Sequence, residues 1–312
     1  LAIRELGYVP NPTARALATQ RAGAVILAVS HDDPALFADP FFGQVIVGVS
    51  AALETTDLVL MLALASSSRG RERVQRVLRS RRADGVMLLA LRGDDPLYHL
   101  TEQLDLPVVV GGRPLHGEPA WYVDADNRGG ACQATEHLIA TGHRRIATIS
   151  GQSDSRASAD RLRGFQETMA LAGLDNTWID HGDFTEDSGA QATTRLLADH
   201  PDLDAIFAAS DNMAAGALRT LKAQGRSVPA DVAVVGFDDL PIARHTDPPL
   251  TSVNQPIQAL GHEMAKMLIS LIDGDRPTAL ILPTRLIVRE SAPLPATAKT
   301  ADPTTIATMR KS

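Results

Sequence analysis

The sequence predicts an α/β protein with two doubly wound parallel sheets, each forming one lobe. Short apolar runs rich in β-branched residues alternate with amphipathic segments between residues 24 and 290. The runs are continuous rather than alternating, which is typical of parallel strands covered by helices on both faces. They are too many for one small sheet. Two lobes of similar size explain them better, with a boundary expected near Gly142–Arg145.

The apolar runs and the spacing between them define the individual elements. The predicted strands are AVILAVS (24–30), LVLMLAL (58–64), DGVMLLA (84–90), PVVVG (107–111), RIATIS (145–150), LDAIFAA (203–209) and DVAVVG (231–236). Between them, apolar residues recur at helical spacing, as at Val74, Val77 and Leu78. Gly173, Gly225 and Gly274 follow predicted helices and are expected as C′ residues.

Composition restricts the class of protein. The chain has 312 residues, 44% of them hydrophobic, and a formal net charge of −7. An acidic average does not favour nonspecific nucleic-acid binding by the whole surface, but it leaves room for a small basic module. Cys132 is the only cysteine, no apolar run approaches the ~20 residues of a membrane span, and the first residues lack a secretory signal. We therefore predict a cytoplasmic protein, with a disordered tail at 293–312.

Polar residues follow the predicted strands, where ligands bind in open α/β sheets. Aspartate, asparagine, serine, glutamine and arginine are mixed there with aromatic residues, which suits sugar hydroxyls and the apolar face of a sugar ring. Asp126 and Asp211 are as readily helix N-caps as ligand groups, whereas Asp238 opens no obvious helix and favours a function. Arg161 by itself favours a solvated helix face. Phe42 fits a buried stripe, so Phe41 is the better ligand candidate of the two.

Other motifs argue against catalysis. No dinucleotide fingerprint, P-loop, zinc-protease motif or nucleophile elbow is present, and the sequence suggests no cofactor and no metal site. The run RGRERVQRVLRSRR (69–82) could be a nucleic-acid patch, but its apolar stripe favours a covering helix with a basic outer face.

The first twenty residues have a different character. LAIRELGY is expected to end a helix, Val9-Pro10-Asn11-Pro12 to form a turn, and TARALATQ to form a short helix. A leucine such as Leu17, with Arg15 beside it, suits insertion into a DNA minor groove. Composition alone favours an ordinary N-terminal arm.

Together these segments resemble the LacI/GalR family of transcription regulators, from Leu1 to about Glu290. The resemblance is carried, in order, by LGYVPNPTARALATQRAG, ADPFFGQVIVGV, VDADNRGGACQATEHLIATGHRRIATISG, RLRGF, ASDNMAAGALRTLKAQGRSVPADVAVVGFDD and PPLTSVNQP. Each segment is weak alone, but the ordered set is highly specific.

The resemblance implies a homodimer with a periplasmic-binding-protein-like core and three crossovers between the lobes. Residues 1–22 would be the end of a DNA-binding headpiece and its hinge helix. The first lobe would be 24–142 plus 255–277, and the second 143–254 plus 278–290. The effector-binding residues predicted from the strand ends and the resemblance are Phe41, Phe42, Arg113, Asp126, Arg161, Phe184, Ser210, Asp238, Asn254 and Gln255. Arg15 and Leu17 would contact DNA from the hinge helix.

The function implied is a sugar-responsive repressor that binds operator DNA. Ser210 stands where many members of the family have asparagine, and Gly112 where some sugar binders have aspartate, which favours a larger sugar or a different ligand. Because the resemblance begins at the last headpiece helix, the recognition helix is expected upstream of Leu1. The alternatives are a secreted solute-binding protein, which a signal peptide upstream would indicate, and a sugar-converting enzyme, which a retained cofactor or metal would indicate.

Overall fold

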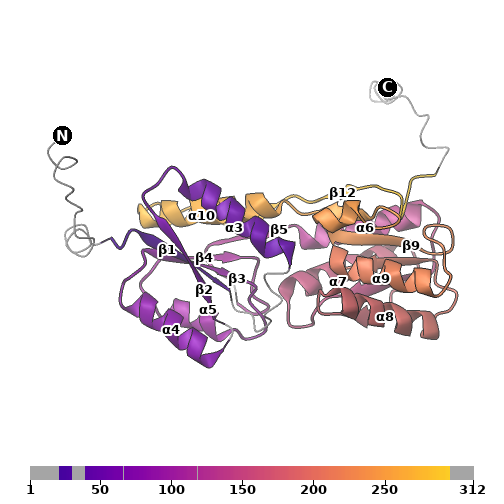
Figure 1. The fold of residues 1–312 in the computed structure, drawn as a ribbon, viewed down its shortest axis with the longest axis horizontal. Helices are drawn as coiled ribbons and strands as arrows, with labels where there is room; N and C mark the ends of the chain where they lie inside the picture. The colour runs from indigo at the N-terminus through magenta and orange to yellow at the C-terminus, as the bar shows by residue number, and fades with distance from the viewer. Residues whose placement is uncertain (1–20, 30–38, 66, 118, 296–312) are drawn as a thin grey trace, which may run out of the picture. The chain divides into compact units, whose positions relative to one another are not determined.

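The computed structural model describes residues 21–29, 39–65, 67–117 and 119–295, which divide into two compact units. Within this range, unit 1 runs to Ala125 and includes 154–156 and 256–282. Unit 2 comprises 126–153, 157–255 and the chain from Pro283 onward. Each unit contains one six-stranded, mostly parallel sheet flanked by helices (Figure 1), which confirms the predicted fold class.

Unit 1 is built on the strand order β11-β5-β4-β3-β1-β2. Its strands are β1 (Ala24–Val29), β2 (Val59–Leu64), β3 (Gly85–Leu89), β4 (Val108–Gly111), β5 (Tyr122–Ala125) and β11 (Leu280–Leu282). Its helices are α3 (Pro40–Leu53), α4 (Ser68–Arg79), α5 (Pro96–Glu102) and α10 (Ile257–Ile272). The central strands β1 and β3 are almost entirely buried, as their continuous apolar sequences predict.

Helices α4 and α5 cover one face of the unit 1 sheet. Val74 and Leu78 of α4 join Leu97 of α5 in one buried cluster with side chains of β1 and β3. The arginines on the outer face of α4, among them Arg69 and Arg73, are exposed, so this segment is the predicted covering helix.

Helices α3 and α10 pack closely against each other in unit 1 (Figure 1). A Cβ at Gly48 of α3 would lie 2.0 Å from the carbonyl oxygen of Gln258, and one at Gly261 of α10 would lie 2.2 Å from that of Val45. Two glycines therefore let the two backbones approach to direct contact.

Unit 2 has the strand order β12-β10-β9-β8-β6-β7. Its strands are β6 (Ile146–Ser150), β7 (Ile179–His181), β8 (Ala205–Ala208), β9 (Ala233–Asp238), β10 (Thr251–Asn254) and β12 (Arg285–Ile287). Its helices are α6 (Asn127–Ala140), α7 (Arg156–Leu171), α8 (Glu186–Asp199), α9 (Asp211–Ala223) and the 3-10 turn η2 (Pro241–Arg244). β12 runs antiparallel to β10, whereas the other described pairings of this sheet are parallel.

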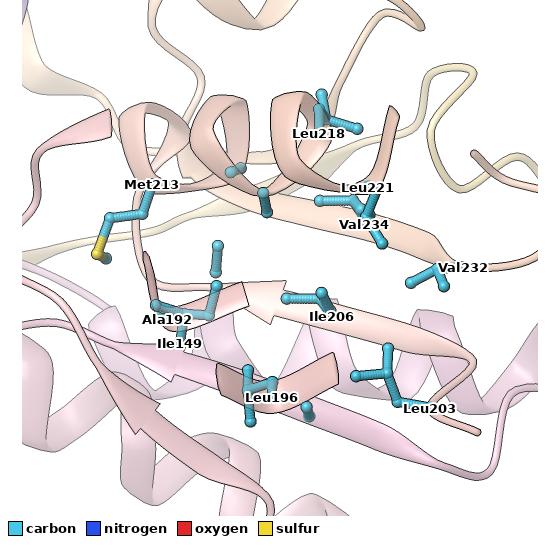
Figure 2. Packing of buried hydrophobic residues seen from close by; sticks show 14 of the residues in the cluster. Ile149, Ala192, Leu196, Leu203, Ile206, Met213, Leu218, Leu221, Val232 and Val234 are labelled. Carbon is cyan, nitrogen blue, oxygen red and sulfur yellow. The ribbon is translucent and has the colours of Figure 1, made fainter. Parts of the chain in front are cut away.

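Side chains of the unit 2 strands point alternately into two cores. Ile206 faces the cluster formed with α8 and α9, where Leu196 and Leu221 also lie (Figure 2). Its neighbour Phe207 faces the opposite cluster, which includes Phe165 of α7. Since both faces are buried, every position of β8 is apolar.

The structure corrects the expected lobe boundaries. The chain leaves unit 1 after Ala125 rather than near residue 142, because the apolar face of α6 is buried with α7 and strands of unit 2. It returns to unit 1 at Pro256 and leaves again after Leu282 rather than after residue 277, because β11 pairs with β5 in the unit 1 sheet.

Several shorter features complete the comparison with the sequence. Five strands of three or four residues each, β5, β7, β10, β11 and β12, were not predicted. Gly173, Gly225 and Gly274 have φ values of +69°, +73° and +92°, as expected of C′ residues. The expected hinge helix and most of the tail at 293–312 lie outside the described residues. Among the described helices, none has the length and apolar character needed to cross a membrane.

Candidate functional site

The carboxyl ends of three parallel strands in unit 2 converge on a buried polar network. Asp238 is the last residue of β9, Ala209 follows β8, and Gln255 follows β10. Because neighbouring strands run parallel, their carboxyl ends share one edge of the sheet, where open α/β sheets bind ligands.

Arg161, from α7, is the centre of this network. Its Nε donates to Asn127 Oδ1 at 2.9 Å and its Nη1 to the carbonyl oxygen of Ala209 at 2.5 Å. Its Nη2 donates to Asp238 Oδ1 and to Gln255 Oε1, both at 3.1 Å. These bonds use four of the five N–H groups of a guanidinium. The fifth, on Nη1, has no hydrogen-bond acceptor among the residues that the structure describes.

The network is buried. Arg161 is 4% exposed and Asp238 8%, and the guanidinium carbon lies 3.7 Å from the ring centroid of Phe237. The sequence alone favoured a solvated helix face for Arg161, and the structure shows that this was wrong. The further hydrogen bonds of Arg161 help to offset the cost of burying an ion pair at this depth.

Asn127 and Phe237 belong to the network although neither was among the predicted site residues. Asn127 is the first residue of α6 and follows a strand end, so the rule that found Asp126 could have found it. Phe237 is apolar and precedes Asp238 within β9, so no sequence signal separates it from a core residue.

Two predicted site residues cap helices. Asp126 accepts a hydrogen bond from the amide of Gly129 at 2.8 Å, and Ser210 accepts one from the amide of Met213 at 3.3 Å. Each precedes or follows a network residue in the chain, Asp126 beside Asn127 and Ser210 beside Ala209. Asp211 does not cap α9, because Ser210 is the N-cap. The side chain of Asp211 is fully buried.

Asn254 and Phe184 are predicted site residues whose described contacts do not include Arg161. Asn254 donates from its side-chain nitrogen to Asp239 Oδ2 at 3.2 Å. Phe184 packs against the α8–α9 core. Its ring lies close to Gly151, since a Cβ added at Gly151 would be only 2.3 Å from Cζ of Phe184. Among the described residues, no hydrogen bond or ring contact links Phe184 to Arg161.

Unit 1 holds the other predicted residues. Arg113, after β4, donates from Nε to Asp124 Oδ2 at 2.8 Å and lies 5.8 Å from the ring centroid of Tyr122. Phe41 and Phe42 begin α3 and meet edge to face, with ring centroids 5.3 Å apart.

Phe42 lines an apolar pocket with Ile46, Leu62 and strand residues of unit 1, which fits the predicted core role. Phe41 is partly buried, and the Asp39 side chain, which caps α3, accepts a hydrogen bond from its amide. Arg15 and Leu17 lie outside the described residues. Among those described, no three His, Cys, Asp or Glu side chains form a group that could hold a metal ion.

The two sheets and the buried polar edge define a ligand-binding protein of the periplasmic-binding-protein type. Residues 135–292 match the family model described as a periplasmic binding protein-like domain. The chain is 49% identical over 296 residues to the HTH-type transcriptional regulator CelR of Thermobifida fusca, covering 93% of this chain and 87% of that protein. It is 32% identical to the HTH-type transcriptional regulator GalR of Escherichia coli, over 94% of this chain and 86% of GalR.

Among solved structures, that of the transcriptional regulator CelR–cellobiose complex superposes with a TM-score of 0.83 at 48% identity, covering 93% of this chain and 88% of that one. The chain belongs to the LacI/GalR family of transcriptional regulators. It is therefore a regulator and not an enzyme.

Proposed function

We propose that this chain belongs to a DNA-binding repressor whose effector is a small carbohydrate larger than a monosaccharide, with cellobiose the first candidate. The observation that carries the proposal is the buried network around Arg161, considered with the cellobiose complex of a relative 48% identical to this chain.

The chemistry of the network suits a sugar. A hydroxyl both donates and accepts, so it can accept from the remaining N–H of Arg161 and donate to a nearby carboxylate or amide oxygen. Ser210 and Gly112 are smaller than the residues expected at their positions, which favours a ligand with more than one ring. A disaccharide such as cellobiose meets this requirement.

The proposed mechanism is a shift between two conformations. The effector would contact Arg161, Asp238, Asn254 and their neighbours in unit 2, and Phe41 and Arg113 in unit 1. It can favour one arrangement of the units only by its difference in affinity for the two states. Through the hinge helix, with Leu17 and Arg15, that difference would change operator affinity.

We also propose that the protein acts as a homodimer, as the family resemblance implies. Exposed apolar side chains on the edge strand β2 and the neighbouring helix α3 support this assignment. Val47 of α3 is 55% exposed, and Leu62 and Leu64 of β2 are 50% and 45% exposed. A second copy that covered these residues would remove apolar surface from water.

The test has two stages. The chain is titrated calorimetrically with cellobiose, glucose and ribose, and the melting temperature is followed in parallel, since a ligand selective for the native state raises it. The full-length gene product then selects genomic DNA fragments, which are rebound with and without cellobiose. We expect binding that favours cellobiose and a ligand-dependent change in DNA affinity. A ligand that binds but leaves DNA affinity unchanged would contradict the regulatory mechanism, and binding of none of the sugars would contradict the effector class.

A further inference from the structure

The turn that presents Asp238 has an unusual backbone. Asp238 has φ +100° and Asp239 has φ +54°, so both are non-glycine residues in the left-handed region, which favours glycine. Such a backbone conformation is unfavourable for a non-glycine residue and persists only where the surroundings hold it. Specific contacts must therefore stabilise this turn.

The buried carboxyl group of Asp211 binds the backbone of this turn. Asp211 is 0% exposed, and its Oδ2 accepts a hydrogen bond from the amide of Leu240 at 2.6 Å. Its Oδ1 accepts one from Ser252 Oγ at 2.5 Å, and the same Ser252 Oγ accepts from the amide of Asp239 at 3.1 Å. The two peptide N–H groups that follow Asp238 are thus tied, directly or through Ser252, to Asp211.

The strand beside the turn leaves space for this carboxyl group. A Cβ at Gly236 of β9 would lie 2.3 Å from Asp211 Oδ1. No side chain can occupy that position while Asp211 keeps its present place. The carboxyl group of Asp211 can therefore approach β9 this closely only because residue 236 is glycine.

A second set of bonds holds the next side chain. Arg289 donates from Nη2 to Asp239 Oδ1 at 2.5 Å and from Nη1 to the carbonyl oxygen of Leu250 at 2.7 Å. Asn254 donates to the other oxygen of Asp239. The residues on both sides of the turn are therefore held in place, and Asp238 Oδ1 accepts a hydrogen bond from Arg161.

We propose that Asp211 is a positioning residue of the effector site, which holds the strained Asp238–Asp239 turn so that Asp238 meets Arg161 without itself touching the effector. This inference rests on the proposed function for its effect on sugar binding. Its effect on the turn is independent of the ligand.

The charged groups around Asp211 affect its pKa. Burial, followed by the nearby Asp238, raises the pKa of Asp211 well above its ordinary value. The charged groups that face this region are Asp238 at the end of β9, Asp239 directly after it, Arg161 bound to Asp238, and Arg289 bound to Asp239. An isosteric amide at position 211 can keep one acceptor oxygen and the shape of the group while removing the ionisation.

The experiment compares Asp211→Ala and Asp211→Asn with the control Thr193→Val. Thr193 is equally buried and loses one hydrogen bond, to the carbonyl oxygen of Gly189 in α8, far along the chain from the turn. Cellobiose affinity is measured by calorimetry. We expect Asp211→Ala to weaken binding by about tenfold or more, the cost of a buried hydrogen-bonding group left without its partner. Asp211→Asn should recover most of the loss, and Thr193→Val should bind as the wild type does.

Hydrogen exchange of the amides of Asp239 and Leu240 provides the second readout, which needs no ligand. Asp211→Ala should speed their exchange by about tenfold or more relative to Thr193→Val. If Asp211→Ala does not fold, Gly236→Ala, which displaces the carboxyl group without deleting it, should produce the same two effects.

The outcomes separate the two proposals. Unchanged exchange at Asp239 and Leu240 would overturn the positioning role, whatever the affinity for cellobiose. Faster exchange with unchanged cellobiose affinity would also overturn it as a role in the effector site. Faster exchange in a protein whose wild type binds no sugar would support the role in the turn and contradict the proposed effector class.

Discussion

At the residue scale, the site depends on one guanidinium whose partners come from four separate parts of the chain. Asn127, Ala209, Asp238 and Gln255 each place one oxygen on Arg161. The sequence located the strand ends that carry these groups, but it could not show that Arg161 enters the core. Burial of a polar side chain depends on distant partners, and helical spacing alone does not reveal them.

Replacing Arg161 by alanine should destabilise unit 2 as well as abolish effector binding. The substitution leaves the buried carboxylate of Asp238 without its cation, a type of change that costs about 3–5 kcal/mol. Urea unfolding and calorimetric titration with cellobiose measure the two effects. Arg163→Ala, on the exposed face of the same helix, is the control and should alter neither. Cellobiose binding unchanged in Arg161→Ala would remove Arg161 from the site.

The titration of Asp211 predicts a pH dependence of stability. Because its pKa is raised in the folded protein, the unfolded chain releases this proton at lower pH than the native state does. The stability of the wild type relative to Asp211→Asn is therefore greatest near pH 4 and below, and it is lost as pH rises through the folded pKa. Thermal unfolding of both proteins from pH 4 to pH 8 checks this. A difference in melting temperature that stays constant with pH would contradict the assignment.

At the scale of elements, the central strands and the covering helices were predicted from the spacing of apolar residues and from the glycines that follow helices. β3 and β8 are buried throughout, and their uniform apolar sequences are unambiguous. The strands β5, β7, β10, β11 and β12 were missed because each has only three or four residues. A strand of that length has no period to detect, and its pairing depends on a neighbour distant in sequence.

The packing of α3 on α10 should be sensitive to one methyl group. Gly48→Ala places a Cβ against the carbonyl of Gln258, so the helices must separate, and we expect a loss of about 2–3 kcal/mol in the stability of unit 1. Among the residues that the structure describes, no atom outside the helix's own nearby backbone lies within 4 Å of a Cβ placed at Gly43, in the same helix. Gly43→Ala should therefore be neutral or stabilising by about 0.5–1 kcal/mol, because alanine favours helix. Equal effects of the two substitutions in urea unfolding would contradict close packing at Gly48.

At the scale of the whole molecule, two units with separate cores are joined by a chain that crosses between them. Unit 1 is completed by α10 and β11, which follow the whole of the unit 2 sheet except β12 in sequence. The LacI/GalR resemblance predicted this interleaving, while the positions of the crossings required the coordinates. The helix α6 shows why, since its apolar face would suit either sheet by composition alone.

The proposed dimer can be tested on the exposed apolar surface of unit 1. Leu62→Lys places a charge on the exposed apolar surface of β2, since Leu62 is half exposed although it also lines the apolar pocket beside Phe42. Sedimentation should show a shift from dimer toward monomer of at least about tenfold in dissociation constant, as expected when a charge must be desolvated in an interface. Leu171→Lys is the matched control, at a leucine that is 91% exposed in unit 2. A dimer equally stable in both variants would place the interface elsewhere.

The sequence alone determined the fold class, the two-lobe organisation, the edge of each sheet that carries polar groups, and the family. These depend on periodicity, on the residues that follow each strand and on ordered motifs, all of which are local along the chain. Only the tertiary structure decided that Arg161 is buried, that Asn127 and Asp211 serve the site, and where the chain crosses between units. Those outcomes depend on which distant groups meet, since a polar side chain is stable in the interior only when its partners are brought to it.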